Sequence, residues 1–215
     1  MENPSKRLKS INPLPYLERL ADIPEDYNFN SAIIVQINNC VSRKLHMHSF
    51  CWNLTQYFPY ANPYTHRKAG PYGNLTHVLF RPSPGTINIA IPKPGCTGPS
   101  IACCFSQYRM GHSQSTYYMY CKNTDEEYRV MSLTKDSYSH RLEYFDKCLN
   151  ILTEKLLCMS NIKIVVFPRY IGCGMAGGNW YDYEIIISRF CFELKIVRPD
   201  IVVHIVERKS LNVKK

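Results

Sequence analysis

The stretch from Lys163 to Val206 constrains the fold most, because two kinds of hydrophobic pattern alternate within it. Lys163–Pro168 is a short apolar run that suits a buried strand, and Trp180–Leu194 has the length and composition of a helix. Ile201–Val206 is a second β-branched run. A glycine-rich segment separates the first strand from the helix. Strand, loop, helix and strand in this order are typical of an α/β domain.

The preceding part of the chain shows the same alternation. Apolar runs predict strands at Ser31–Ile37, Thr86–Ile91 and Ser100–Gln107. Helical spacing predicts a helix over residues 46–58, which Pro59 stops. We therefore expect an α/β fold with a mixed, largely parallel sheet between helices.

A longer helix is predicted over Asp136–Met159. Asp136 or Ser137 is a plausible N-cap for it. Its apolar stripe is formed by Leu142, Phe145, Leu149, Leu152 and Leu156.

The chain divides into one domain with extensions. Residues 1–28 are polar, contain four prolines and look like a loose N-terminal arm, with a short helix expected at Tyr16–Leu20. Residues 29–207 form the predicted domain, and residues 208–215 a basic tail. A polar, tyrosine-rich stretch at about 108–134 is predicted to be an insertion or a lid, because structureless loops of that length are uncommon in compact domains.

Composition supports a packed core and limits the partners. Hydrophobic residues make up 45% of the 215 residues and charged residues 20%. The formal net charge is +9, and much of the excess lies at the two ends of the chain. Such ends are usually solvated, with a polyanion such as nucleic acid as the alternative partner. No motif for sequence-specific nucleic-acid recognition accompanies them.

Ten cysteines raise the question of disulfides. No signal peptide is visible at the N-terminus, and Cys103, Cys104, Cys148 and Cys191 lie inside apolar runs, where a thiol packs as a small core residue. We therefore expect a reduced protein of the cytoplasm, the nucleus or both. We expect no metal, because there is no Cys-x-x-Cys pair, and no other cofactor. No run approaches the ~20 apolar residues of a membrane-spanning helix, so no membrane partner is expected.

The glycine-rich segment carries the strongest functional signal. Four of the ten glycines fall within seven residues, in Gly172-Cys173-Gly174-Met175-Ala176-Gly177-Gly178, and Asn179 follows at the predicted N-cap. Glycine permits positive φ and close backbone approach, so successive amides can face an anion. The start of the next helix also favours negative charge. The segment is therefore predicted to bind phosphate, the alternative being an ordinary turn between strand and helix.

Several motifs, in order, resemble those of macro domains. The segment from Val165 to Trp180 resembles their second phosphate loop, with an "IGCGLAGGxW" signature. Val35-Gln-Ile-Asn-Asn-Cys40 resembles the strand and asparagines that precede the first loop, and Phe58–Tyr64 with Arg67-Lys68 resembles a "YPYANxYxxRK" turn. Pro84–Ile87 and Ile101–Gln107 resemble the "PGTI" and "INLFAQ" strands. The likeness covers roughly residues 31–206.

This resemblance implies a three-layer α/β/α sandwich that binds ADP-ribose or an ADP-ribosylated protein. By that likeness Asn38 or Asn39 would contact the distal ribose, and Gly172–Gly178 would wrap the diphosphate. Phe105, Ser106 and Gln107 would line the cleft. Phe167 or Tyr170 would lie near the adenine or a ribose.

The sequence also departs from the family in places that matter for catalysis. No glycine occurs in Val41–His48, where the first phosphate loop belongs, and Arg43 and Lys44 either compensate by charge or are exposed. Related glycohydrolases place an aspartate after the Gly-Cys-Gly-Leu run, where this chain has Ala176. Their central-strand lysine has no counterpart in Ile101–Gln107.

The catalytic candidates each have an ordinary structural explanation. They are Asn39, His46 and Asp182, and His48 and Cys173 are weaker. A histidine is commonly a surface or capping residue, Asp182 is favoured by the helix dipole alone, and Cys173 is a small residue between two glycines.

Three functions remain open at this point. The chain binds ADP-ribose or a close derivative; or it hydrolyses ADP-ribosyl groups or ADP-ribose 1″-phosphate; or it is a degenerate interaction module.

Overall fold

The central sheet has six strands in the part of the chain that the computed structural model describes, residues 17–20, 27–47, 49–70, 75–113 and 135–207. Their order is β1-β6-β5-β2-β4-β3, and all neighbours are parallel except β3 and β4. The bounds are β1 Leu17–Leu20, β2 Ala32–Asn39, β3 Thr86–Ala90, β4 Ser100–Gln107, β5 Ile164–Pro168 and β6 Val202–Val206. The mixed, largely parallel sheet is confirmed.

The short helix expected at Tyr16–Leu20 is wrong, because Leu17–Leu20 is a strand that pairs in parallel with β6. Leu17 lies in the core, Glu18 pairs with the buried His204, and Arg19 pairs with Glu184. Two leucines three residues apart are compatible with a helix or with a strand. The strand forms because the edge of β6 is free to pair with it.

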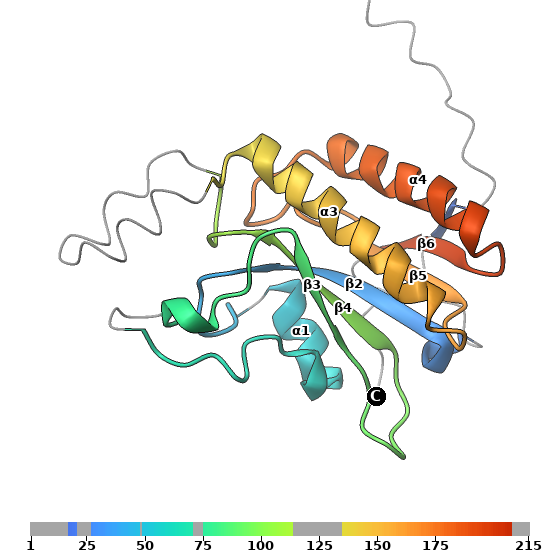
Figure 1. Ribbon diagram of the computed structural model, residues 1–215, viewed down its shortest axis with the longest axis horizontal. Coiled ribbons are helices and arrows are strands. Elements are labelled where there is room, and N and C mark those ends of the chain that lie inside the picture. The colour runs from blue at the N-terminus through green and yellow to red at the C-terminus, as the bar shows by residue number, and fades with distance from the viewer. Residues whose placement is uncertain (1–16, 21–26, 48, 71–74, 114–134, 208–215) are drawn as a thin grey trace, which may run out of the picture.

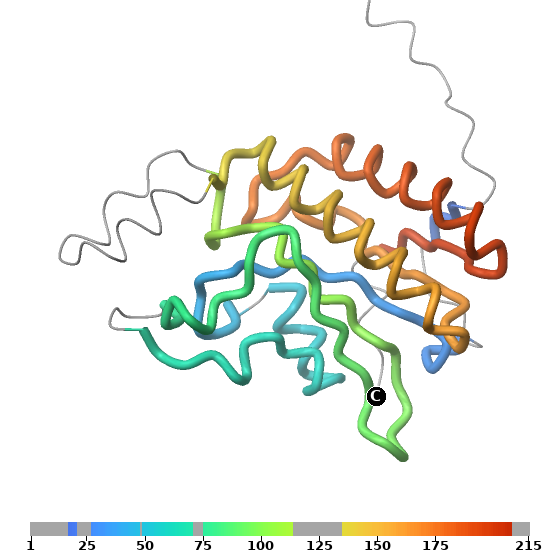
Figure 2. Tube along the Cα trace, viewed as in Figure 1, coloured from blue at the N-terminus to red at the C-terminus, as the bar shows by residue number. Residues whose placement is uncertain are grey.

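Among the described residues, three α-helices cover the sheet, α3 and α4 on one face and α1 on the other (Figure 1). Their bounds are α1 Phe50–Tyr57, α3 Tyr138–Leu157 and α4 Trp180–Val197. Three short 3₁₀ turns, η2 Phe29–Ser31, η3 Pro59–Ala61 and η4 Val78–Phe80, lie in the connections. The connection between the antiparallel strands β3 and β4 extends away from the helices at the lower right of the trace (Figure 2). The expected α/β/α sandwich is confirmed.

Each helix begins at a capping side chain. Ser137, one of the two expected caps, accepts a hydrogen bond from the amide of His140 at the start of α3. α1 begins at Phe50, four residues later than the predicted helix over 46–58, because Ser49 caps it by accepting from the amide of Trp52. The residues from His46 onward are therefore available to form a loop.

Two hydrophobic clusters fill the spaces on either side of the sheet. Alternate residues of the central strands point to opposite clusters, so Cys103 packs toward α1 and Cys104 toward α3 and α4. The described cysteines are free thiols; Cys96 and Cys158 are exposed, Cys173 is partly buried, and the others are buried. None of the described helices has the length and apolar character that crossing a membrane requires. Of the predicted insertion, residues 114–134 lie outside the described part.

Candidate functional site

The carboxyl ends of β2, β4 and β5 converge on one cavity with a volume of about 300 Å³. Parallel strands of an α/β sheet end at the same edge, and ligands bind there. Predicted site residues that line the cavity are Asn38, Asn39, His46, Gln107, Tyr170, Gly172, Gly174, Met175 and Ala176. Segments far apart in the sequence therefore meet as the strand order requires.

The two asparagines that end β2 differ in what their side chains do. Asn39 is bound within the protein: its Oδ1 accepts from the Ser42 amide at 2.7 Å, and its Nδ2 donates to the Tyr64 hydroxyl at 3.3 Å. Asn38 donates through Nδ2 to Cys51 Sγ at 3.3 Å, but its buried Oδ1 has no hydrogen-bond partner among the described residues. A buried acceptor without a partner is costly, so Asn38 is the asparagine with unused capacity at this wall.

Arg67 holds the loop that follows β2. Its guanidinium donates to the carbonyl oxygens of Asn39 (2.9 Å), Cys40 (3.0 Å) and Ser42 (2.6 Å). It also stacks on the ring of Tyr64, 4.1 Å from the centroid. Burial lowers the pKa of Arg67 from its ordinary value. Three carbonyls converging on one guanidinium fix the turn by a side chain, in a segment without glycine.

The loop after β5 is shaped by its own backbone. Tyr170, Gly172 and Gly177 have positive φ angles of 61°, 76° and 68°. The Cys173 amide donates to the Tyr170 carbonyl at 3.0 Å, the Gly177 amide to that of Gly174 at 2.9 Å, and the Gly178 amide to that of Gly172 at 3.0 Å. The loop therefore folds as successive tight turns.

Four amides of this loop are left without an acceptor. They belong to Gly172, Gly174, Met175 and Ala176, all of which line the cavity, and none donates to any acceptor in the described part of the chain. Nearby backbone amides without partners in tight turns form a concavity that suits an anion. The N-terminal turn of α1, at Ser49–Cys51, lies on the cavity wall as well and adds the positive end of a helix dipole.

Two solved structures are similar to this arrangement. The macrodomain of Mycobacterium tuberculosis DarG matches with a TM-score of 0.55 and 14% identity, over 89% of this chain and 96% of that one. The macrodomain of Thermus aquaticus DarG matches with a TM-score of 0.54 and 12% identity, over 89% and 97%. The chain has the macrodomain fold. No family model matches the sequence, and comparison with the curated proteins gives no match.

Within the macrodomain fold, three of the loop's glycines are required by packing. A Cβ on Gly172 would lie 2.3 Å from Cζ of Tyr183, and one on Gly178 would lie 2.6 Å from the Gly172 carbonyl oxygen. A Cβ on Gly177 would lie 2.1 Å from Nδ1 of His112. These glycines bring the loop onto α4 and the segment after β4, and so position the amides that line the cavity.

The structure places the other predicted site residues outside the cavity wall. Phe167 is fully buried and packs edge-on against Phe190. Phe105 lies in the cluster on the α1 side, under the guanidinium of Arg67. Cys173 packs against the core, and burial followed by the charge of Asp182 raises the pKa of its thiol to about 11. A thiol of that pKa stays protonated near neutral pH and is a poor nucleophile.

The start of α4 also lies outside the described cavity wall. Asn179 caps the helix by accepting from the amide of Tyr181 at 3.1 Å, as predicted for an N-cap. Asp182 accepts from the hydroxyl of Tyr138 at 2.6 Å, and that hydroxyl in turn accepts from the Asn179 amide at 3.1 Å. Asp182 therefore joins α3 to α4, and α1 is the helix whose N-terminus lies at the cavity.

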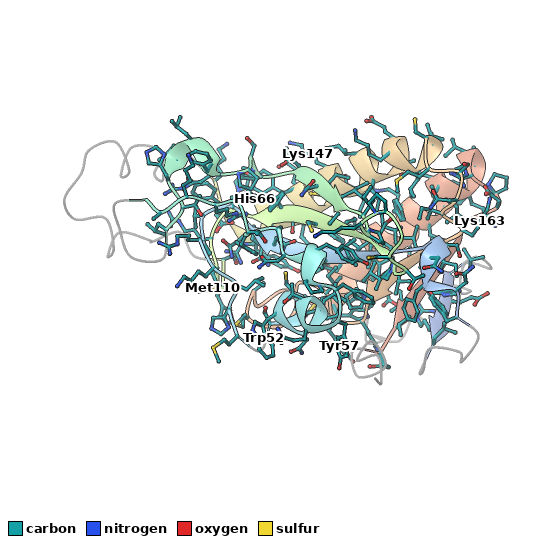
Figure 3. The ribbon with its side chains drawn as sticks, turned by 90° about the horizontal axis from the view of Figure 1, so that it is seen from below. Trp52, Tyr57, His66, Met110, Lys147 and Lys163 are labelled. Carbon is teal, nitrogen blue, oxygen red and sulfur yellow. The ribbon has the colours of Figure 1, made fainter. Side chains whose placement is uncertain are left out.

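Several residues that line the cavity are not among the predicted site residues. Tyr64 lines it, and Arg67 lies behind it; both belong to a motif recognised in the sequence, but their contacts with the β2 loop depend on the folded chain. Leu45, Ser49, Phe50, Cys51, Met110, Gly111, Pro168, Arg169 and Ile171 also line the cavity. Met110 and the Trp52 end of α1 lie on the same side of the molecule (Figure 3). Arg43 and Lys44, considered as substitutes for loop glycines, do not line it.

A buried ion pair joins the loop after β4 to the glycine-rich loop. Arg141 donates to Asp136 through Nε at 2.9 Å and Nη2 at 2.7 Å, and both side chains are almost fully buried. Asp136 also accepts from the amides of Tyr108 and Arg109. Arg141 donates further to the carbonyls of Gly111 (2.6 Å) and Ala176 (3.4 Å). Asp136, one of the two expected caps, thus organises a loop instead.

Proposed function

We propose that this protein binds ADP-ribose, or a closely related ADP-ribosyl derivative, in the cavity between α1 and the loop after β5. The observation that carries the proposal is a set of four residues that line the cavity and whose amides have no acceptor in the described part, Gly172, Gly174, Met175 and Ala176. A diphosphate supplies several anionic oxygens, which such amides bind well. The ordered motifs that resemble macro domains, together with the macrodomain fold, support an ADP-ribosyl group as the ligand.

The remaining cavity wall supports a sugar beside the diphosphate. Asn38 lines the cavity and its buried Oδ1 has no partner in the described part, so a turn of the side chain toward the cavity would let Oδ1 accept from a ribose hydroxyl. Gln107 and Ser49 add polar groups, while Phe50, Met110 and Tyr170 add apolar and aromatic surface for a base or a ribose face. The volume of about 300 Å³ is at the lower end of the range of small-molecule pockets, roughly 300–1,000 Å³.

Binding is favoured over hydrolysis by the groups that line the cavity. In the described residues of its wall, the side chains that can carry charge near neutral pH are those of His46 and Arg169, and no carboxylate or lysine is among them. Asp182, the acid considered from the sequence, is engaged with Tyr138 away from the wall. Ala176 stands where related glycohydrolases carry an aspartate. The wall therefore offers hydrogen-bond donors and acceptors more than an acid and base pair.

Calorimetric titration with ADP-ribose tests the proposal, using Met175→Glu as the decisive variant. Met175 is 45% exposed on the cavity wall, so a carboxylate fits there but repels a bound diphosphate. We expect at least about tenfold weaker binding. Met47→Glu is the matched control, because Met47 is 60% exposed and does not line the cavity. Equal affinity in both variants would show that the diphosphate does not bind at this loop.

The wild-type protein separates the remaining functions. Absence of heat with ADP-ribose and with ADP-ribose 1″-phosphate at millimolar ligand would overturn the proposal and favour an interaction module. Release of phosphate from ADP-ribose 1″-phosphate, or of ADP-ribose from a mono-ADP-ribosylated protein, would make the protein a hydrolase. We expect binding of the ligand without either product.

A further inference from the structure

The outer face of α4 carries a second apolar stripe, on the side away from the core. Its members are Tyr181, Ile185, Phe192 and Ile196, which are 51%, 49%, 57% and 70% exposed. At 100° per residue these four positions fall within about 60° of the helix circumference. The buried positions, among them Tyr183, Ile187 and Leu194, lie on the opposite side. No described residue covers the stripe, so α4 is apolar on two faces.

The neighbouring helix α3 shows that this is a specific feature of α4. The two helices lie side by side in one layer (Figure 1), and Arg189 of α4 pairs with Asp146 of α3. Four exposed positions that share one face of α3 are polar, namely Glu143, Lys147, Asn150 and Glu154. Lys147 is labelled on this helix in Figure 3. A solvated outer face is therefore polar in this layer, and the stripe on α4 departs from it.

We propose that the stripe on α4 binds the same stripe of a second copy of the chain, with the two helices antiparallel. The order of the side chains carries the assignment, because the stripe is symmetric about the midpoint between Ser188 and Arg189. Tyr181 and Ile196 are equally far from that midpoint, and so are Ile185 and Phe192. A twofold axis there places each aromatic residue of one copy opposite an isoleucine of the other. Ser188, a small residue, lies where the helices approach most closely.

Charges beside the stripe agree with the same arrangement. Glu184 and Lys195 lie on one flank of α4 and near opposite ends of it. In an antiparallel pair related by a twofold axis, the same flanks meet, so Lys195 of one copy lies close to Glu184 of the other. Glu184 already pairs with Arg19 of its own chain, so Lys195 would join an existing ion pair. On the other flank the charge of Arg189 is already compensated by Asp146. The polar outer face of α3 would then form the rim around an apolar centre, which is the usual composition of an interface.

The oligomeric state of the full chain tests this inference. Sedimentation velocity over about 1–100 µM protein should show a dimer for the wild type. Phe192→Glu should weaken the dimer at least about tenfold, because it buries an unpaired charge at the centre of the interface. Leu157→Glu is the matched control, since Leu157 is 54% exposed on α3 and lies off the stripe. Circular dichroism and ADP-ribose binding report whether each variant is folded.

A cysteine at the twofold axis tests the orientation. Ser188→Cys should form a disulfide-linked dimer under mild oxidation, whereas Ile196→Cys should give no more cross-linking than the wild type, because position 196 faces Tyr181 of the other copy in the antiparallel pair. A parallel pair places position 196 opposite itself and would cross-link both variants. A wild type that remains monomeric at about 100 µM overturns the proposal, as does a dimer that Phe192→Glu leaves unchanged. Flotation of a monomeric wild type with lipid vesicles would assign the stripe to a membrane surface instead.

Discussion

The two loops that face each other across the cavity are held in opposite ways. The segment after β2 has no glycine, and a guanidinium from elsewhere in the chain, that of Arg67, gathers its carbonyl groups. The loop after β5 is held by glycine turns with positive φ and by close packing against Tyr183 and His112. One wall is therefore built by side-chain contacts over long sequence separation, and the other by local backbone conformation.

This difference decides what each wall offers a ligand. In the tight turns after β5, several amides make no hydrogen bond within the loop, so they are available as donors to an anion. The guanidinium of Arg67 points its donors at carbonyls of its own chain, so the charge of Arg67 is used to shape the wall. The side chain of Asn38 is what this wall offers instead.

The largest effect is expected at Arg141, whose side chain supports the wall formed by the glycine-rich loop after β5. Arg141→Met leaves the buried carboxylate of Asp136 without its partner and frees the carbonyls of Gly111 and Ala176. We expect a loss of about 3–5 kcal/mol in the free energy of unfolding, measured by urea denaturation. The double variant with Asp136→Asn should lose less than the sum of the two single variants. Additive losses would mean that the pair does not act as a unit.

Gly172→Ala should have the next largest effect. The new methyl group meets the Tyr183 ring at 2.3 Å and sits on a backbone with φ of 76°, so we expect a loss of about 2–4 kcal/mol. Gly111→Ala is the control, because Gly111 also has positive φ (87°) and lines the cavity but has open space around it. It should lose only about 1 kcal/mol, the cost of the backbone conformation. Equal losses would show that packing against Tyr183 contributes nothing.

The sequence predicts the backbone-built wall better than the other, for a physical reason. Glycine clusters and apolar runs are local signals, so the loop after β5 and most strands are recognisable along the chain. The contacts of Arg67 with Asn39–Ser42 and of Arg141 with Asp136 and Ala176 depend on the fold, because any surface arginine looks the same in sequence. The three packing glycines illustrate the limit: their pattern indicates a turn, and only the structure shows that Tyr183 and His112 require it.

The predictions that failed have the same origin. The helix expected at Tyr16–Leu20 is a strand because β6 has a free edge to pair with, which no local pattern reports. The predicted helix over 46–58 starts too early because the spacing of Met47 fits a helix, while the cap at Ser49 sets its true beginning. The bond between Asp182 and Tyr138 is likewise not visible in the sequence, because it forms only once α3 and α4 are packed, while a catalytic role of Asp182 stays a prediction.

Arg67→Met tests the wall built by a side chain. Removing the guanidinium leaves three carbonyl groups without their donor, in a partly buried site, so we expect a loss of about 2 kcal/mol in the free energy of unfolding. Lys68→Met is the control, because Lys68 is exposed beside it and should change stability by less than about 0.5 kcal/mol. Similar losses in thermal or urea unfolding for the two variants would show that Arg67 does not hold the loop after β2.

The smallest expected effect is a difference in stability between glycine and alanine variants, and its sign should differ between the two walls. Tyr170 has a φ of 61°, which costs a residue with a side chain about 1 kcal/mol and glycine almost nothing. Tyr170→Gly should therefore be more stable than Tyr170→Ala by about 1 kcal/mol, because both lose the edge-on contact with Trp180 and only glycine relieves the backbone. Lys44, on the other wall, is exposed and is not among the described residues with positive φ.

At Lys44 the order of the two variants should reverse. Glycine gains more conformational freedom than alanine in the unfolded chain, so Lys44→Gly should be less stable than Lys44→Ala by about 0.5 kcal/mol. Comparing the difference between glycine and alanine at each site cancels the loss of the native side chain, and urea unfolding of the four variants measures it. The same sign at both positions would mean that local backbone conformation does not distinguish the two walls, and that the glycine-rich loop is held by its packing alone.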